Sequence, residues 1–465
     1  MLRDIINKEM LDTISSPKFV FTFLLCTILI LLSVYTGINS YRAELGEYNA
    51  SIALNRKNLE SQPSYGALAG LGVKVTKPPQ VLSTIVSGIQ EAVGRKASVN
   101  VAYDPSLVDS KYDSNPVFAV FGELDLSFIV KIVLSLLAIL FTFDAVVGEK
   151  ERGTLKLTLS NNVPRDRFIL GKAIGSFASL LLPLIIPMVL GLIILTVYPD
   201  ISLTGEDWLR IGIIFILFLL YISVFFMLGL FVSARTSRSS TSLLVLLFIW
   251  VTFVTVIPRA AVMAAGQIYP IPSVHEITAQ KDAFLQEIQG LAPQKLNEWR
   301  QENPPQDTQE YQDKFKKFLE ELQQDLTSKI DKKNAAIEEE YQAKRRKQEA
   351  LATNLSRISP TSTLMFGAMS LGRTGIHEHE RFLNSIKTYK PVFTKWVNAK
   401  MMRTLKLGSV EQPRPDISDM PVHQFEPESL NQSLAAALPD FAIMILLIIL
   451  FFTGAFVSFL RYDVR

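Results

Sequence analysis

The sequence of 465 residues has one cysteine, Cys26, and only four histidines. A single cysteine cannot form a disulfide within the chain, which excludes the disulfide-stabilised class of secreted domains. Cys26 lies inside a long apolar run, so we interpret it as a lipid-facing or helix-facing residue rather than a reactive thiol.

The chain also lacks a nucleotide-binding motif. No stretch fits the phosphate-binding pattern G-x-x-x-x-G-K-[ST]. Gly148 and Gly153 have the required spacing, but Thr154 follows them where the pattern needs a lysine. No catalytic triad can be recognised either. We therefore predict no catalytic residue and no cofactor in this chain; if the protein works against a gradient, another chain supplies the energy.

One short run resembles a metal site at first sight. His377, Glu378, His379 and Glu380 are adjacent in HEHER, but the zinc-binding helix pattern His-Glu-x-x-His fails at Arg381. We interpret this run as solvated charge and predict no metal. The net charge of +3 is small and gives no reason to expect a nucleic-acid partner.

What the chain does have is apolar residues in long blocks. They make up 49% of the sequence, and the charged 20% lies mostly between the blocks. A bilayer core needs about 20 apolar residues of helix to cross it. Six blocks meet this length, at 19–38, 126–147, 168–197, 208–232, 243–264 and 438–460. The sequence therefore predicts an all-α polytopic membrane protein with six transmembrane helices.

Basic residues predict the orientation of these crossings. They gather in the prelude 1–18, in the hinge 148–167, after the fourth crossing and in the tail 461–465. The short loop between crossings three and four, 198–207, has no lysine or arginine. Because short cytoplasmic loops carry the excess of basic residues, we expect both termini and the hinge to be cytoplasmic, in a bacterial inner membrane. The prelude alternates apolar and charged residues at helical spacing, which suits a helix in the membrane interface.

Two large polar regions then face outward. Residues 39–125 contain an apolar-periodic piece at 81–93 and a strand-like piece at 98–105, which predict an α+β insertion after the first crossing. Residues 265–437 are mainly helical by pattern. We interpret them as a helical hairpin that packs one apolar stripe against Phe284, Leu285, Ile288 and Trp299; a stalk that contacts a partner protein or the cargo is the alternative. The stripe consists of Tyr311, Phe315, Phe318, Leu319, Leu322, Leu326 and Ile330.

The hinge and its flanks carry a recognisable motif. An acidic residue is followed by Gly-Thr-Leu, a short apolar-periodic stretch, Pro-Arg, and a lysine early in the next crossing. In this chain the motif consists of Glu149, Gly153, Thr154, Leu155, Leu159, Pro164, Arg165 and Lys172. It resembles the permease subunits of ABC-2-type ABC transporters. Residues 357–375 and the terminal YDVR resemble a branch with large extracytoplasmic domains, similar to copper-enzyme maturation permeases. Asn161 and Asn162 depart from the small or apolar pair usual in that motif.

This resemblance implies partners and a mechanism. Two copies of an ABC ATPase subunit, with ATP and Mg, would bind below a pair of permease subunits, either identical or homologous. The hinge would form a short coupling helix that enters a groove of the ATPase. Gly153 permits a tight turn, Thr154 can cap a helix start, and Leu155 and Leu159 can fill an apolar pocket. Pro164 stops the helix, and Arg165 can pair with acidic groups or lipid phosphate.

Small residues and prolines recur every four residues in the third crossing. They are Gly171, Gly175, Ser179, Pro183, Pro187 and Gly191. Such spacing lets helices approach closely, and proline weakens the local hydrogen bonding. Two interpretations stay open: a flexing seam near the cargo path or the dimer interface, and ordinary packing within the subunit.

Few charges lie inside the predicted crossings. Lys131, Asp144 and Arg259 are all near the ends of their helices. Lys131 can extend to the interface, and Asp144 can pair with Lys150 or Arg152. The absence of a charge at mid-membrane argues against an ion-coupled transporter.

Three functions fit these observations. The first is a permease subunit that couples ATP hydrolysis on a partner to export of a substrate. The second is a mechanotransmission subunit whose outer regions act on an extracytoplasmic partner, with nothing crossing the bilayer. The third is a membrane receptor or scaffold. The sequence does not identify a cargo.

Overall fold

The computed structural model describes residues 2–101, 105–108, 125–160, 164–305, 308–406 and 414–462. The chain divides into two compact units. The first unit combines Met1–Thr255 with Ser359–Arg465, and the second consists of Val256–Ile358. The first unit therefore brings together residues from both ends of the sequence.

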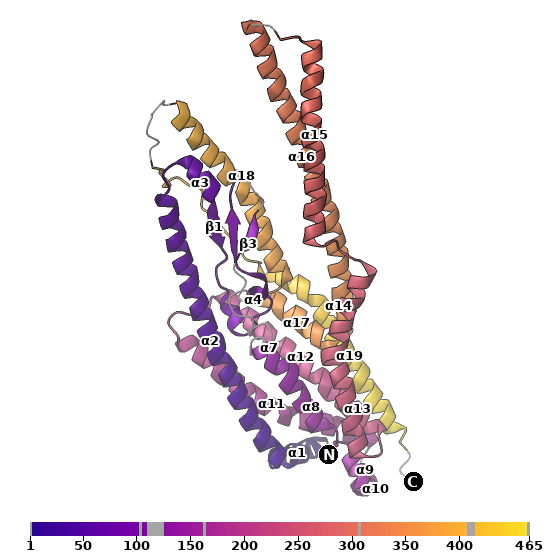
Figure 1. Ribbon diagram of the computed structural model, residues 1–465. Coiled ribbons are helices and arrows are strands. Elements are labelled where there is room, and N and C mark those ends of the chain that lie inside the picture. Colours follow the sequence, from indigo (N-terminus) through magenta and orange to yellow (C-terminus); the bar gives the residue numbers. More distant parts are fainter. Residues whose placement is uncertain are drawn as a thin grey trace. The chain divides into compact units, whose positions relative to one another are not determined.

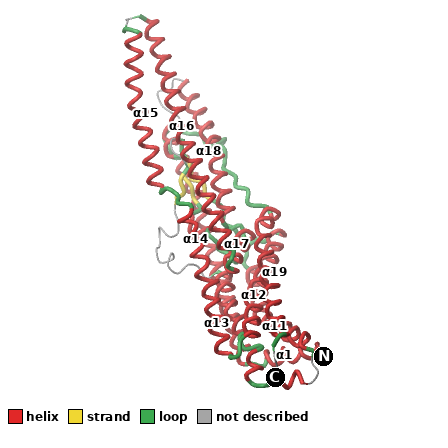
Figure 2. Tube along the Cα trace, turned by 90° about the vertical axis from the view of Figure 1, so that its right-hand side faces the viewer, coloured by secondary structure: helices red, strands yellow, loops and turns green. Residues whose placement is uncertain are grey.

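Six helical spans among the described residues are long and apolar enough to cross a membrane, which confirms the predicted fold class. They are Pro17–Glu60, Leu126–Glu151, Arg165–Val197, Gly205–Arg235, Ser239–Ile268 and Leu430–Leu460. In the first unit, the N-terminal helix, the hinge and the end of the last helix lie at one end, which we call the hinge end (Figure 1). The strands lie toward the opposite end, which we call the sheet end (Figure 2).

The chain begins with two helices. Helix α1 (Leu2–Ile14) is followed by α2 (Pro17–Glu60). Proline occupies the first position of α2, where its missing N–H costs nothing, and the Ser16 side chain accepts a hydrogen bond from Phe19 N. Helix α2 continues far beyond the expected crossing of 19–38. It thus supplies both the first span and part of the sheet end.

The second and fifth spans each contain a π-helical turn. The second consists of α7 (Leu126–Ile129), a π-helix (Val130–Leu134), α8 (Ser135–Thr142) and α9 (Val147–Glu151). The third and fourth are α11 (Arg165–Val197) and α12 (Gly205–Arg235). The fifth consists of α13 (Ser239–Val251), a π-helix (Thr252–Val256) and α14 (Ile257–Ile268). The sixth is α19 (Leu430–Leu460).

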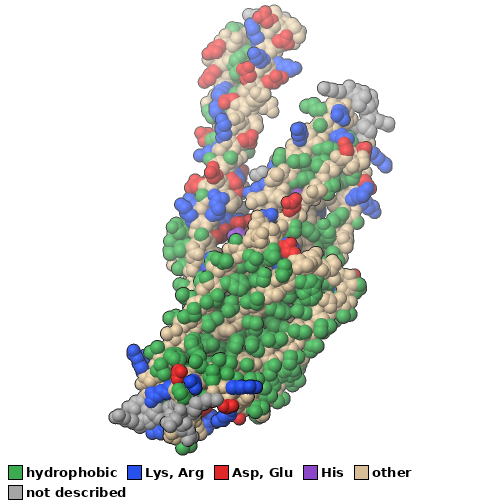
Figure 3. Space-filling view, turned by 180° about the vertical axis from the view of Figure 1, so that it is seen from behind, with side chains coloured by type: hydrophobic (Ala, Val, Ile, Leu, Met, Phe, Trp, Pro, Cys, Tyr) green, Lys and Arg blue, Asp and Glu red, His purple; other side chains and the backbone are tan. Residues whose placement is uncertain are grey.

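Helix α12 lies at the centre of the membrane-spanning core. It packs along α8, α19 and a short helix α17 (Pro360–Leu371), and its aromatic side chains Phe218, Tyr221 and Phe225 are fully buried. Lipid is as apolar as these side chains, so close packing and hydrogen bonds between helices stabilise the arrangement more than burial from water does. The face seen in Figure 3 is broadly apolar, and charged side chains border the apolar area.

A small three-stranded antiparallel sheet lies at the sheet end, in the order β1-β2-β3. The strands are β1 (Val73–Thr76), β2 (Lys96–Val99) and β3 (Ser106–Val108). Short helices α3 (Tyr65–Leu71) and α4 (Gln90–Val93) flank them, and α18 (Ile376–Lys406) packs against β2. We call this part the sheet domain. Its core consists of Leu59, Leu68, Val73, Val75, Ala97, Val99, Phe382, Ile386, Tyr389, Phe393 and Val397.

The structure refines the two regions that the sequence placed outside the membrane. Within 81–93, only the 3-10 turn Val81–Thr84 and α4 are helical, and Leu82, Ile85 and Val86 pack with the membrane-spanning core. The strand expected at 98–105 is formed at Lys96–Val99, and residues 102–104 lie outside the described residues. The region 265–437 is more than one hairpin. Its α17 is buried against the spans and its α18 belongs to the sheet domain.

The hairpin lies in the second unit, together with α14. Helices α15 (Val274–Glu302) and α16 (Gln309–Ser356) run side by side and antiparallel (Figure 1). Trp299 contacts the rings of Tyr311, Phe315 and Phe318, as the apolar stripe predicted. Ile288 is buried as expected, whereas Leu285 is exposed.

Candidate functional site

The hinge consists of two short helices joined by a tight turn. Helix α9 ends at Glu151, and α10 runs over Thr154–Ser160. Gly153 between them has φ +73°, in the left-handed region that glycine adopts without a steric penalty. This confirms the turn expected at Gly153, and no neighbouring atom crowds its open side.

Helix α9 is fixed to the end of α12. The Ser233 hydroxyl accepts hydrogen bonds from Val146 N and Val147 N over 3.0 and 3.1 Å. The Lys150 ammonium donates to the carbonyls of Ala234 and Thr236. The ammonium also lies 4.5 Å from the centre of the Tyr462 ring. The start of the hinge is therefore bound directly to the end of α12.

A buried ion-pair cluster joins the hinge to α11 and α1. Lys172 Nζ donates to Glu149 Oε1 over 2.7 Å and to the carboxylate of Glu9 over 3.0 Å. Ser176 Oγ donates to the same Glu9 carboxylate over 3.0 Å. Only 5% of Lys172 is exposed, so its charge depends on these two partners. Helix α1 of the prelude thus packs on α11 through Glu9 and also through Leu2 and Ile5, which face Gly171.

The small residues of α11 allow this approach. A Cβ on Gly171 would meet the Ile5 side chain, and one on Gly175 would meet the Ile6 carbonyl oxygen at 2.9 Å. A Cβ on Gly191 would meet Val34 of α2 at 2.9 Å. Ser179, Pro183 and Pro187 are buried, and α11 continues through both prolines as one helix. The structure shows this face packed within the subunit, against α1 and α2.

Several hinge residues have other partners than the sequence suggested. Leu155 is 2% exposed and packs against Val146, Phe168 and other residues of its own chain, so it cannot fill a pocket of a partner. Thr154 is the first residue of α10, and its hydroxyl bonds back to the Glu149 carbonyl over 3.4 Å instead of capping α10. The side chain of Leu159 lies outside the described residues, as do Asn161 and Asn162.

The end of the hinge also differs from expectation. Helix α10 ends at Ser160, before Pro164, and Pro164 is instead the residue just before α11. Arg165 Nη1 donates to the carbonyls of Leu460 and Tyr462 over 2.8 and 3.0 Å. It therefore caps the end of α19, where a cation suits the helix dipole, and it has no acidic partner among the residues that the structure describes.

One expected ion pair is wrong. Asp144 pairs with Lys18 of α2 over 2.8 Å, and not with Lys150 or Arg152. Lys150 is already bound to α12 carbonyls, and Arg152 Nε donates to Gly148 O. Lys131 lies over the Phe128 ring at 5.5 Å, and Arg259 is exposed in α14.

The sequence reasoning missed Leu157, the one residue of α10 that presents a large apolar side chain to solvent among those the structure describes. Leu157 is 67% exposed, close to the value for the lipid-facing leucines of the spans. It stands on a helix of only seven residues whose start is anchored to α9. The sequence did contain an indication of this exposure. Leu155, Leu157 and Leu159 alternate along α10, and one helical face cannot bury all three.

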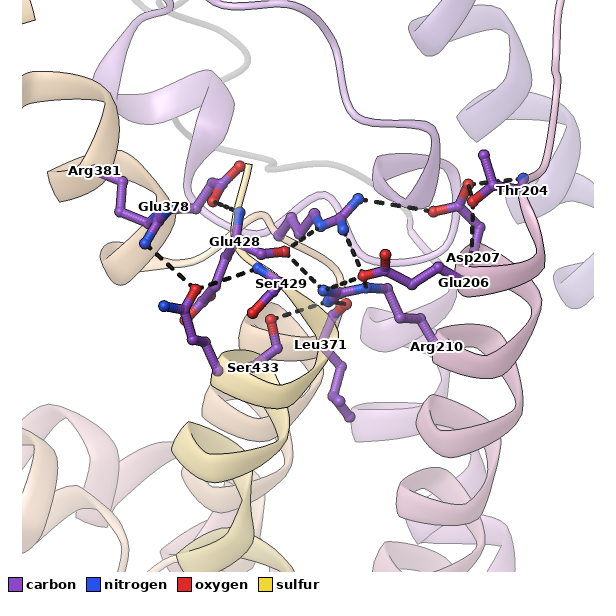
Figure 4. Close-up of polar contacts among 12 residues, drawn as sticks. Thr204, Glu206, Asp207, Arg210, Leu371, Glu378, Arg381, Glu428, Ser429 and Ser433 are labelled. Atoms are coloured by element: carbon purple, nitrogen blue, oxygen red, sulfur yellow. Dashed lines mark hydrogen bonds and ion pairs between the residues drawn. The ribbon is translucent and has the colours of Figure 1, made fainter. Parts of the chain in front are cut away.

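A second cluster was missed at the sheet end. Arg210 lies in the first turns of α12 and is fully buried, although it belongs to a predicted crossing. Its guanidinium contacts Glu206, Ser433 and the carbonyls of Leu371 and Glu428 (Figure 4). Glu206, four residues earlier in the sequence, could have indicated this pair. Near it, Glu378 of the HEHER run is 1% exposed, so that run is not entirely solvated.

Burial has a clear effect on two charged groups of the sheet domain. Glu378 lies away from water, and this raises the pKa of its carboxyl, although Lys77 and the Glu428 N–H act in the opposite direction. Lys77 is 3% exposed, and burial lowers the pKa of its ammonium to about 8. These groups carry no metal-ligand geometry: no cluster of three or more metal-binding side chains occurs in the part of the chain that the structure describes.

The family model described as ABC-2 family transporter protein matches residues 3–464, which is nearly the whole chain. No curated protein matches the sequence significantly.

Proposed function

Because this chain belongs to the ABC-2 family of transporter proteins, we propose that it couples ATP hydrolysis on a separate ATPase subunit to export of a substrate. The family and the six spans make it a multi-pass membrane permease. Members of such a family act with an ABC ATPase subunit. ATP and Mg would be held on that partner.

The observation that carries the proposal is the way in which the hinge is fixed. Lys172 ties Glu149 to α11 and α1, Ser233 ties α9 to α12, and Arg165 ties the start of α11 to α19. A displacement of α9 and α10 therefore acts on four membrane-associated helices at once. Such anchoring suits an element that receives movement from another protein.

Leu157 is the proposed contact for that protein. An apolar side chain that is 67% exposed on a short anchored helix would gain by entering an apolar groove. Leu155 then has a different task, because it fixes α10 to the core of its own subunit. In the described part of the hinge, Glu149, Leu155 and Arg165 thus hold it to the rest of the subunit, while Leu157, which is outside the motif, faces outward.

The proposal places the hinge end and both termini in the cytoplasm, in a bacterial inner membrane. The basic residues of the hinge and the loop around Arg235 and Arg238 support this orientation. The sheet domain would then be extracytoplasmic. Two ATPase subunits and a second permease subunit, identical or homologous, would complete a two-fold or pseudo-two-fold assembly.

The test compares two carboxylates placed on the same exposed helix. The tagged chain is coexpressed with its ATPase subunit and purified in mild detergent as wild type, Leu157→Asp and Ser160→Asp. We expect wild type and Ser160→Asp to retain the ATPase subunit and its activity. Leu157→Asp should lose the subunit, or keep it with hydrolysis uncoupled from the permease.

Two results would overturn the proposal. If no ATPase subunit copurifies with the wild-type chain, the permease does not form the expected complex. If Leu157→Asp behaves as Ser160→Asp does, then α10 is not the contact. Thermal unfolding of each variant distinguishes loss of contact from loss of folding, since neither position is buried.

A further inference from the structure

The contacts of Arg210 are unusually complete for a buried cation. Nε and Nη2 donate to Glu206 Oε1, and Nη2 also donates to the Glu428 carbonyl. Nη1 donates to the Leu371 carbonyl and to Ser433 Oγ. A guanidinium has five N–H donors, and here each has an acceptor within 3.1 Å. Arg210 therefore holds α12, the end of α17 and the start of α19 together.

Arg373 repeats part of this pattern from the turn after α17. Its Nη2 donates to Glu206 Oε1 over 2.6 Å and its Nε to the Glu428 carbonyl over 2.8 Å. Two arginines thus share one carboxylate oxygen and one carbonyl oxygen. Because the acceptors are shared, neither arginine can move without disturbing the contacts of the other.

Glu428 connects this pair to the sheet domain. Its carbonyl accepts from both arginines, while its N–H donates to Glu378 Oε2 on α18 over 3.0 Å. Helix α18 supplies Phe382 and Phe393 to the core of the sheet domain. The two peptide groups that flank Glu428 therefore link the central span α12 to the sheet domain. We call Glu206, Arg210, Arg373, Glu428 and Glu378 the joint.

A second set of hydrogen bonds connects the joint to residues 88–90, in the polar region that follows the first span. Gln90 Nε2 donates to the Arg373 carbonyl over 2.9 Å, and Ile89 N donates to the Thr374 carbonyl over 3.0 Å. Gly88 has φ +63°, and a Cβ there would meet Thr374 O at 2.4 Å. The turn at Arg373 is therefore held both by α12 and by the segment that leads into β2.

The joint also contains one residue in an unfavourable backbone conformation and two buried oxygens without a hydrogen-bond partner. Arg373 has φ +57°, a left-handed conformation that is sterically unfavourable for a residue other than glycine. Within the described residues, Glu378 Oε1 and Glu428 Oε2 are buried without a hydrogen-bond partner. Strained backbone and unsatisfied buried oxygens lower the cost of a rearrangement, because the present arrangement is not fully satisfied.

We propose that the joint transmits displacement of α12 to the sheet domain, so that this domain changes its conformation with the nucleotide state of the ATPase. The inference rests on the proposed function, because the hinge moves α12 through Ser233. Arg210 and Arg373 act as positioning residues, and no substrate contact is assigned to them. The sheet domain becomes a moving part of the transporter and not a fixed cover.

The experiment follows amide hydrogen exchange in the complex of the full chain with its ATPase subunit, reconstituted in lipid nanodiscs. Exchange is compared between the nucleotide-free complex and the complex trapped with ATP and vanadate. Peptides from the hinge, 147–160, report arrival of the movement. Peptides from α18 and from β1 and β2 report its transmission.

Three variants separate transmission from folding. Arg210→Lys keeps the charge but cannot make the same five hydrogen bonds. Arg373→Gly removes the guanidinium and also relieves the strained backbone, so it should fold well. Arg42→Gln is the control, since it breaks an exposed ion pair with Asp200 at the same end of the molecule.

The expected result is a nucleotide-dependent change in both sets of peptides for wild type and Arg42→Gln. In Arg210→Lys and Arg373→Gly the change in the hinge should persist while the change in α18 and the strands is lost. A merely structural role would alter exchange equally in both nucleotide states. If the hinge of the wild type does not respond, the proposed function fails. If the hinge of the wild type responds but its sheet domain does not, this inference fails. It also fails if the sheet domain of Arg373→Gly responds as that of the wild type does.

Discussion

Lys172 of α11 bonds to Glu149 of α9 over 2.7 Å, and this pair joins two residues of one motif that are 23 positions apart in the sequence. Glu9 of α1 completes the cluster. A lysine early in a crossing and an acid before a glycine turn are thus physical partners. The role of each in coupling stays a proposal, but their contact gives it a mechanical basis.

The first prediction concerns this cluster. Lys172→Met leaves two largely buried carboxylates without their cation. We therefore expect the free energy of unfolding of the protein to fall by about 3–5 kcal/mol. Thermal or SDS-induced unfolding in detergent measures the loss. Adding Glu9→Gln and Glu149→Gln to Lys172→Met should recover much of it, because the uncompensated charges are then gone.

Lys18→Met is the matched control for that variant. It breaks a pair with Asp144 whose two side chains are 53% and 36% exposed, so the loss should stay below about 1 kcal/mol. Equal losses for Lys172→Met and Lys18→Met would show that the buried cluster has no special weight.

The second prediction separates the two leucines of α10. Leu155→Ala opens a cavity beside Phe168 and Phe459 and should cost about 2–5 kcal/mol. Leu157→Ala removes only exposed surface and should change stability by less than about 0.5 kcal/mol. Unfolding of the chain without its ATPase subunit measures both. Comparable losses at the two positions would contradict the burial of Leu155.

The third prediction tests the close approach of α1 to α11. Gly175→Ala places a methyl group 2.8 Å from Glu9 Cβ and 2.9 Å from a backbone oxygen, so α1 must shift. We expect a loss of about 1–3 kcal/mol, as for other overpacked sites. Gly212→Ala on α12 meets no atom within 4 Å and should be neutral within about 1 kcal/mol. A neutral Gly175→Ala would mean that α1 is not held at this distance.

The fourth prediction uses the buried ammonium of Lys77, whose pKa is lowered to about 8. Below that pH the amine is charged in both the folded and unfolded chain, and the full cost of burying the charge is present. As the pH rises above about 8, the folded amine loses its proton before the unfolded one, so stability increases. Lys77→Met should therefore be more stable than wild type at pH 7, with the difference shrinking as the pH rises.

Lys74→Met is the control for this pH series, because Lys74 is exposed on β1, the strand that ends just before Lys77. Its difference from wild type should not depend on pH between 7 and 10. Thermal unfolding of the three proteins over this range supplies the comparison. A Lys77→Met variant that is less stable than wild type at pH 7 would show that attraction to Glu378 outweighs the burial of the charge.

The sequence predicted most of what depends on local pattern. Six apolar blocks give six spans because a helix of that length satisfies its own backbone hydrogen bonds in lipid. The turn at Gly153 was predictable because glycine alone adopts its conformation freely. The stripe at Tyr311, Phe315 and Phe318 was also predictable, because a solvated hairpin shows its buried face as a helical period. These features need no knowledge of distant residues.

Partners across the fold were not predictable in the same way. Periodicity marks Leu155 and Leu157 as apolar, but only the position of α10 against Phe168 decides which one is buried. Asp144 could pair with Lys150 or Arg152, which are near in sequence, or with Lys18, which is distant. The position of α2 places Lys18 beside Asp144, and this pair forms. Arg210 and Glu428 are 218 residues apart, and they meet because α12 and α19 pack together.

The amino-acid sequence by itself therefore determined the spans, the hinge and the family, since each depends on residues close together in the chain. Tertiary structure decided which charges are buried and with whom they pair, because a charge in a low-dielectric core is stable only where several elements bring acceptors to it. Lys172 and Arg210 are two examples, one at each end of the first unit.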